Sequence, residues 1–200
     1  VGDPIIGSSH RDILKKFEIL PPLKGEFRFL TPRMIGFQAD KAIPGATRVR
    51  VTLKQGLADL KNHRLDKDLA WTFNTETIKL TNLPGSKEYP EQEIPPFDIK
   101  PKLQITSNTE LNLDSLKKSS TLIPEGKPEA VTLTATDTKT DIGENIPETE
   151  YNSSEKTWIY NLTPDRPLDK ATKYNLKIAA GLLPLGGNLP SENAFNSEIN

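Results

Sequence analysis

The feature that most constrains the fold of this chain is a stretch that occurs twice. Residues 44–57 read PGATRVRVTLKQGL, and residues 168–182 read LDKATKYNLKIAAGL. Both copies have Ala-Thr followed by a basic residue, then apolar residues at alternate positions, then Gly-Leu. Alternation of apolar and polar residues is typical of a half-buried β-strand. Because a long-period repeat indicates a repeated structural unit, the sequence predicts two related β units.

Short alternating segments bounded by turn residues surround both copies. The chain has 17 prolines and 12 glycines in 200 residues, which fits a fold with many turns. Residues 12–16 and 114–118 are each compatible with one helical turn, and no stretch has sustained helical periodicity. Short strands at regular spacing predict an all-β chain of two tandem β-sandwiches. The strands are expected near residues 17–19, 27–29, 34–37, 48–53, 69–75, 102–106, 130–135, 157–162, 174–178 and 194–198.

The predicted organisation is a first sandwich over residues 1–76, a linker over residues 77–96 and a second sandwich over residues 97–200. A polar insertion is expected at residues 136–154. The first unit has no clear counterpart of the strand at residues 102–106, since its opening residues are rich in Gly and Ser. We therefore expect the first sandwich to lack its first strand, or to keep a remnant near Ile5 and Ile6, in a chain that is a fragment of a longer protein. An open strand edge would invite pairing with another chain.

The inward half of each alternating strand predicts the core. A shared ending, Phe-Asn-Thr-Glu at residues 73–76 and Phe-Asn-Ser-Glu at residues 195–198, suggests equivalent closing strands. The side chains expected to be mostly buried are Val49, Val51, Leu53, Trp71, Phe73, Tyr174, Leu176, Ile178 and Phe195.

Composition excludes several classes of function. The 26 basic and 27 acidic residues give a net charge of −1, so no nucleic-acid partner is expected. No apolar run is long enough to span a bilayer, so membrane insertion by this chain is not expected. The absence of cysteine excludes disulfides, cysteine nucleophiles and Cys-ligated zinc, but does not fix the compartment.

The block at residues 44–75 resembles a bacterial Ig-like domain of surface-layer and other exported proteins. The first unit matches at Ile43, Thr47, Val49, Val51, Leu53, Gly56, Trp71 and Phe73, although the family often has Tyr at the place of Val49 and Gly-Asn at the place of Asn62-His63. The second unit matches at Pro164, Leu168, Thr172, Tyr174, Leu176, Ile178, Gly181, Gly187, Asn188, Leu189 and Phe195.

Tandem pairs of such domains resemble the N-terminal region of bacterial α2-macroglobulin-like proteins, which trap proteases. This resemblance implies a non-catalytic, structural, extracytoplasmic module. Its partners would be other domains of the same long chain and, in the full-length protein, a protease. The alternatives are a stalk of an adhesin or surface-layer protein and a carbohydrate-binding accessory domain of a secreted enzyme.

The sequence predicts no catalytic, cofactor-binding or metal-binding residues and no cofactor. Glu91-Gln92 would need a cysteine to form a macroglobulin thioester, and the chain has none. Ser8, Ser9, His10 and Asp12 carry the groups of a catalytic triad, but they lie in an irregular lead-in and not on a scaffold that makes them converge. Chance composition is the preferred interpretation.

Three further groups have a structural and a functional interpretation. Asp137, Asp141, Glu144 and Asn145 could supply oxygen ligands to Ca²⁺, but their spacing is not that of an EF-hand, so a solvated loop is preferred. Trp71 and Trp158 could stack on sugars, but their apolar neighbours favour the core. His63 and the sequons at Asn152 and Asn161 are interpreted as non-functional, as is the basic strip of Arg28, Arg48, Arg50 and Lys54.

Overall fold

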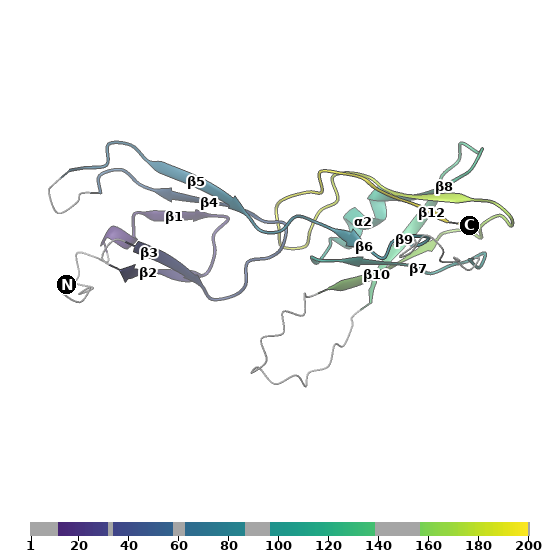
Figure 1. The fold of residues 1–200 in the computed structure, drawn as a ribbon, viewed down its shortest axis with the longest axis horizontal. Helices are drawn as coiled ribbons and strands as arrows, with labels where there is room; N and C mark the ends of the chain where they lie inside the picture. The colour runs from purple at the N-terminus through teal and green to yellow at the C-terminus, as the bar shows by residue number, and fades with distance from the viewer. Residues whose placement is uncertain (1–11, 32–33, 58–62, 87–96, 139–156, 200) are drawn as a thin grey trace, which may run out of the picture.

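The computed structural model describes residues 12–31, 34–57, 63–86, 97–138 and 157–199. It is an all-β sandwich structure with short helical turns. Strands β1 to β5 lie at one end of an elongated molecule, and β6 to β12 lie at the other end (Figure 1). No helix in the described part of the chain is long and apolar enough to cross a membrane.

The N-terminal part is built from two small antiparallel sheets. One sheet has the order β1-β4-β5 and the other pairs β2 with β3. The strands are β1 (Phe17–Leu20), β2 (Gly25–Thr31), β3 (Met34–Ala39), β4 (Arg48–Leu53) and β5 (Leu69–Asn74).

Aromatic rings join these two sheets. Phe27 of β2 lies with its ring centroid 4.9 Å from that of Phe17 on β1 and 4.9 Å from that of Phe37 on β3. On the facing sheet, Val49 is fully buried and Val51 is 7% exposed. Rings at this spacing add attraction to the area that they bury, so they hold a core that only two facing strands cover.

The C-terminal part forms one continuous seven-stranded sheet in the order β12-β11-β8-β9-β10-β7-β6, folded over a common core. Asn112 caps the N-terminus of helix α2 (Leu113–Ser119) by accepting a hydrogen bond from the Ser115 amide at 2.9 Å. The strands are β6 (Leu80–Thr81), β7 (Leu103–Ser107), β8 (Ser120–Pro124), β9 (Val131–Thr138), β10 (Trp158–Pro164), β11 (Tyr174–Ile178) and β12 (Phe195–Ile199).

Alternation along the central strands fills this core. Tyr174, Leu176 and Ile178 on β11 are buried, while the residues between them face water. Tyr160 on β10 is buried with its hydroxyl accepting a hydrogen bond from the Leu111 amide at 2.7 Å. Burial raises the pKa of this hydroxyl, so the phenol stays neutral. Ile78 and Leu80, within the stretch expected to be a linker, also belong to this core.

Most of the predicted core is confirmed, and two residues of it are wrong. Trp71 and Phe73 are 48% and 44% exposed, and Leu69 on the same strand is 51% exposed. Their register is as expected, because Trp71 opposes Val51 and Phe73 opposes Val49. The side chains therefore lie on the same face of the sheet as the buried Val49 and Val51, but within the described residues the other sheet consists of β2 and β3, and both rings remain about half exposed. The residues confirmed as buried are Val49, Val51, Tyr174, Leu176 and Ile178, and Leu53 and Phe195 are half-buried.

Two details of the sequence prediction are corrected by the register. Phe73 opposes Val49 at the start of β4, whereas Phe195 opposes Ile178 at the end of β11, so the two Phe-Asn endings are not structurally equivalent. The polar segment expected from residue 136 begins later, because β9 continues to Thr138 opposite β10. The remainder of that segment, and the remnant strand expected at Ile5 and Ile6, lie outside the described residues.

A matched pair of leucine substitutions tests the two environments. Leu176→Ala should destabilise the chain by about 2–5 kcal/mol, because it leaves a cavity in a closed core. Leu69→Ala should cost less than about 1 kcal/mol, because half of that side chain already contacts water. Urea denaturation followed by circular dichroism measures both. Equal losses for the two variants would show that β5 is covered.

Candidate functional site: the junction between the two parts

The closest contact between the two parts is a turn of the N-terminal part that enters the C-terminal core. The turn, residues 44–47, leads into β4 and carries the Ala-Thr of the repeated stretch. Ala46 adopts a positive φ of 50° and is fully buried within the C-terminal core cluster. A non-glycine residue in this backbone region costs energy, so the surrounding contacts must hold it.

Backbone hydrogen bonds fix Ala46 from both parts of the molecule. Its amide donates to the Glu76 carbonyl at 2.7 Å, which ties the turn to the end of the N-terminal part. Its carbonyl accepts from the amides of Asn188 at 3.1 Å and Leu189 at 2.8 Å, which belong to the C-terminal part. A single buried peptide unit therefore links the two parts, and both of its polar groups are satisfied.

Two glycines allow this close approach. A Cβ added to Gly187 would lie 2.5 Å from the carbonyl oxygens of both Gly45 and Ala46. A Cβ added to Gly45 would clash with the Thr109 side chain. Gly187 therefore leaves room for the backbone of the turn, and Gly45 leaves room for the side chain of Thr109.

The side chain of Asn188 adds a second connection. Its Oδ1 accepts from the Arg48 amide at 2.7 Å, and its Nδ2 donates to the Arg48 carbonyl at 3.1 Å. This two-point contact pairs the first residue of β4 as a neighbouring strand would. Two hydrogen bonds with fixed directions restrict rotation about the junction more than one bond would.

Threonine hydroxyls hold the turn itself in shape. Thr47 Oγ1 donates to the Pro44 carbonyl at 2.8 Å, and Thr75 Oγ1 donates to the same carbonyl at 2.9 Å. The Thr47 amide in turn donates to Thr75 Oγ1 at 2.8 Å. These hydrogen bonds that shape the turn are all made within the N-terminal part.

Asn108 fastens the connecting segment in a similar way. Its Oδ1 accepts from the Lys79 amide at 2.8 Å, and its Nδ2 donates to the Thr77 carbonyl at 3.0 Å. Lys79 also forms an ion pair with Glu76. The hydrogen bond from Lys79 is the main cause that lowers the pKa of Glu76, and Asn108 contributes to it. The chain between the two parts is thus bound on both sides of the junction.

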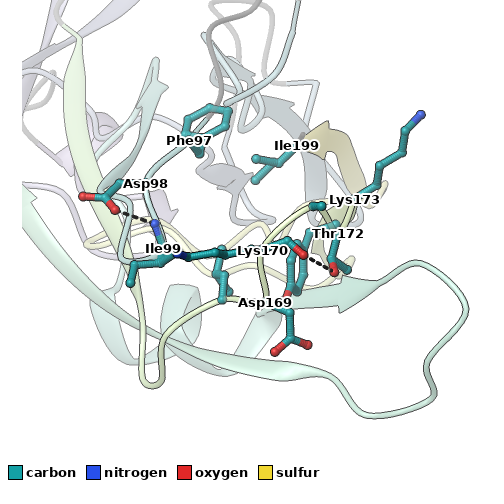
Figure 2. A pocket seen from close by; sticks show the side chains of 11 residues that line it. Phe97, Asp98, Ile99, Asp169, Lys170, Thr172, Lys173 and Ile199 are labelled. Carbon is teal, nitrogen blue, oxygen red and sulfur yellow. Dashed lines mark hydrogen bonds between the residues drawn. The ribbon is translucent and has the colours of Figure 1, made fainter.

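A cavity of about 330 Å³ lies at the other end of the C-terminal part (Figure 2). Most of its polar groups have local partners: the Asp169 carboxylate pairs with Lys127, and Lys173 pairs with Glu198. The Asp98 carboxylate accepts from the Ile99 amide at 2.6 Å, and the Thr172 hydroxyl donates to the Lys170 carbonyl at 3.2 Å. The Asp169 amide donates to the hydroxyl of Tyr174 at 2.8 Å. No set of convergent, unpaired groups marks this cavity as a catalytic site.

Many candidate residues of the sequence analysis lie outside the described part of the chain. Asp12 forms an ion pair with Lys15, while the other members of its group lie outside the described residues. Asp137 is exposed on β9, and Asp141, Glu144, Asn145 and Asn152 lie outside the described residues, as do Glu91 and Gln92. Among the described residues, no group of three or more His, Asp or Glu side chains could hold a metal ion.

The remaining candidates have local contacts. Trp158 packs against the C-terminal core, whereas Trp71 is half exposed. Asn161 donates from Nδ2 to the Thr138 hydroxyl at 2.6 Å. The basic strip is neutralised in part: Lys54 pairs with Glu18 at 2.9 Å, and Arg28 pairs with Glu26 at 2.5 Å.

The rest of the strip and His63 lie at exposed positions. Arg48 donates from Nε to Asn74 Oδ1 at 3.1 Å, and Arg50 is exposed on β4. His63 is exposed at the edge of the described chain. The interpretation of the strip as a solvated sheet face therefore agrees with its position.

Sequence reasoning missed the junction, although it noted the residues. Gly187, Asn188 and Leu189 stood out only as a loop that matched a family pattern. Nothing in a linear pattern shows that this loop contacts residues 44–48, since the two segments are far apart in the chain. The Ala-Thr of the repeat was likewise noted, but the same dipeptide at residues 171–172 lies on the surface loop of the cavity.

Comparison with known proteins finds a relative that matches most of the chain. It is 51% identical over 191 residues to an "Alpha-2-macroglobulin homolog" from Nostoc sp. (strain PCC 7120 / SAG 25.82 / UTEX 2576). The match covers 94% of this chain and 10% of that protein. No family model matches the chain. Almost all of the chain is therefore similar to one region of an α2-macroglobulin homolog, and it spans about a tenth of the length of this relative.

Removal of the two hydrogen bonds between the Asn188 side chain and the Arg48 backbone tests the junction. Asn188→Ala deletes both side-chain bonds to Arg48, so the two parts should sample a wider range of orientations. The chain has no cysteine, so Lys15→Cys and Lys170→Cys place two spin labels at chosen exposed sites, one in each part. Double electron–electron resonance should show a broader distance distribution for Asn188→Ala than for the labelled parent. Asn175→Ala, on the exposed face of β11, is the matched control and should leave the distribution unchanged.

Acid should weaken the fold through exposed carboxylates. The pKa of Asp68 is lowered mainly by a hydrogen bond from the backbone amide of Gln55. The pKa of Asp165 is lowered mainly by a hydrogen bond from the Thr132 hydroxyl, and the pKa of Asp169 is lowered mainly by a hydrogen bond from Lys127. A carboxylate with a lowered pKa stabilises the folded state above its unfolded pKa, near 4, and this contribution is lost as pH falls through the folded value.

Asp165→Asn therefore should lose less stability than the parent between pH 5 and pH 3, because its side chain no longer takes up a proton on unfolding. Thermal unfolding at both pH values measures this. A variant whose stability falls as steeply as that of the parent would show that Asp165 does not contribute to acid sensitivity.

Proposed function

We propose that this chain is a non-catalytic structural region of an exported bacterial protein, from the N-terminal region of an α2-macroglobulin-like protease inhibitor. The observation that carries this proposal is the 51% identity to an α2-macroglobulin homolog across 94% of the chain. In this proposal, residues 1–76 and 97–200 are tandem Ig-like domains joined by residues 77–96, and they lie in the periplasm or at the cell surface.

Strand pairing supports the tandem organisation. In chain order, the antiparallel pairs β1-β4, β4-β5 and β2-β3 correspond to β8-β11, β11-β12 and β9-β10. In the resulting three-strand groups, β1-β4-β5 and β8-β11-β12, the middle strands β4 and β11 both lie in the repeated stretch. Such a recurrence is expected when one unit has been used twice.

The junction supports a structural role. Ala46 and Asn188 connect the parts through backbone and amide groups, which fix an orientation and offer no reactive group. A region of this kind positions other domains of the same long polypeptide. In the full-length protein, those domains would engage a protease, and this chain would contribute scaffold alone.

Trp71 gives one observation in favour of the carbohydrate-binding alternative, because its exposed ring could stack on a sugar. Its neighbours along the inward face are Leu69 and Phe73, which cannot donate or accept the hydrogen bonds that orient a sugar. A stalk of an adhesin or surface-layer protein uses the same fold, and the similarity to an α2-macroglobulin homolog does not favour it.

Protease trapping is tested directly with the isolated chain. Incubated with trypsin at equal molar concentration, the chain should not slow the hydrolysis of casein, because scaffold domains alone cannot enclose a protease. It should also elute separately from trypsin on a sizing column after partial cleavage. Stoichiometric inhibition or stable co-elution would overturn the scaffold role and make this chain an inhibitor by itself.

A further inference from the structure

The inward face of β5 is apolar and uncovered. Leu69, Trp71 and Phe73 alternate along the strand and are 51%, 48% and 44% exposed. Directly opposed residues of an antiparallel pair share a face, and Trp71 opposes Val51, which is only 7% exposed. Exposure thus rises within one row of side chains, from the middle strand to the edge strand of the same sheet.

In the C-terminal part, β12 occupies the place that β5 has in the N-terminal part, and its inward face is covered. Its sheet continues beyond β10 into β7 and β6, so a four-strand section faces β12. Leu103 and Ile105 of β7 are fully buried, and Ile199 of β12 is 2% exposed. In the N-terminal part, β3 has β2 on one side, and no described strand lies on its other side. The missing neighbour is the counterpart of β7.

The two strands that border this gap lack the usual protection of open edges. Native sheets guard their edges with charged residues or proline, which block pairing with a further strand. Strand β3 reads MIGFQA and β5 reads LAWTFN, so neither contains a charge or a proline. The other three strands of the N-terminal part each carry at least one charged residue. The unguarded edges are therefore the ones that face the gap.

We infer that the edge of β3 and the inward face of β5 form an acceptor slot for one additional β-strand. The occupant is an extended segment with aliphatic residues at alternate positions, supplied by the polypeptide on the N-terminal side of Asp12. It pairs antiparallel with β3, as β7 pairs with β10, and its aliphatic side chains cover Trp71 and Phe73.

Chain order favours this source over a second molecule. In the C-terminal part, β7 is followed by helix α2 and then β8. In the N-terminal part, a helical turn at residues 12–14 likewise precedes β1. A strand placed before that turn would follow the same chain order as β7, helix α2 and β8. The relative from Nostoc is about ten times longer than the matched region, so further polypeptide is present in a protein of this kind.

A strand supplied by fusion tests the slot. The sequence of β7 with its flanking residues, KLQITSN, is placed directly before Val1, with residues 1–11 as the connection. Trp158→Phe in all versions makes tryptophan fluorescence report on Trp71. The matched control fusion carries Asp in place of the Leu and the Ile of the added strand, so it has the same length but cannot bury its alternate side chains.

The fused strand should reduce acrylamide quenching of Trp71 several-fold and slow hydrogen exchange at the amides of β3. It should also raise the midpoint of thermal unfolding of the N-terminal part by about 4 °C or more. The control fusion should resemble the unfused chain in all three measurements. Equal behaviour of the two fusions would overturn the inference.

Oligomeric state separates this occupant from a second copy. We expect the fused chain to be monomeric by light scattering on a sizing column. An unfused chain that forms a stable dimer with Trp71 already shielded from acrylamide would assign the slot to a second copy and overturn the N-terminal source. Protection of Trp71 without slower exchange at β3 would overturn the strand geometry.

Discussion

The insertion of Ala46 into the C-terminal core is the contact on which the arrangement of the molecule depends. The backbone amide and carbonyl of Ala46 are its polar groups, and both form hydrogen bonds. The amide donates to the N-terminal part, and the carbonyl accepts from the C-terminal part. The close passage of Gly187 belongs to this contact, whereas the positive φ of Ala46 recurs at its repeat counterpart Ala171 and so belongs to the repeated turn. An apolar side chain in a core and a satisfied peptide unit together make a joint that excludes water.

This joint restricts the movement of two parts that each have a modest core. Two small sandwiches connected by a free linker would move independently, because few contacts would cross between them. Here Asn108 binds the connecting residues Thr77 and Lys79, and Asn188 binds Arg48 at the start of β4. Asparagine suits the task, since one side chain both donates and accepts and so imitates a neighbouring strand.

The N-terminal part has an asymmetry that the joint does not resolve. Its aromatic contacts between Phe17, Phe27 and Phe37 close one side of the sandwich, while Trp71 and Phe73 leave the other side open. Burial of large rings is among the strongest sources of stability in a small domain. The inferred additional strand would convert the open side into a second closed core, which would make the stability of this part depend on the polypeptide that precedes it.

The sequence by itself determined the fold class and most of the strands, although not β6 or β8, because alternation at Val49 and Val51 or at Tyr174, Leu176 and Ile178 is a local property of the chain. Its expectation that the first unit lacks a strand stays a prediction, since residues 1–11 lie outside the described part of the chain. Only the tertiary structure decided which inward faces are covered: Trp71 alternates as Leu176 does, yet burial depends on a neighbouring strand and not on the residue's own pattern. It also decided that Asn188 contacts Arg48, since such a contact arises when the backbones of two distant segments meet, and no linear spacing encodes that meeting.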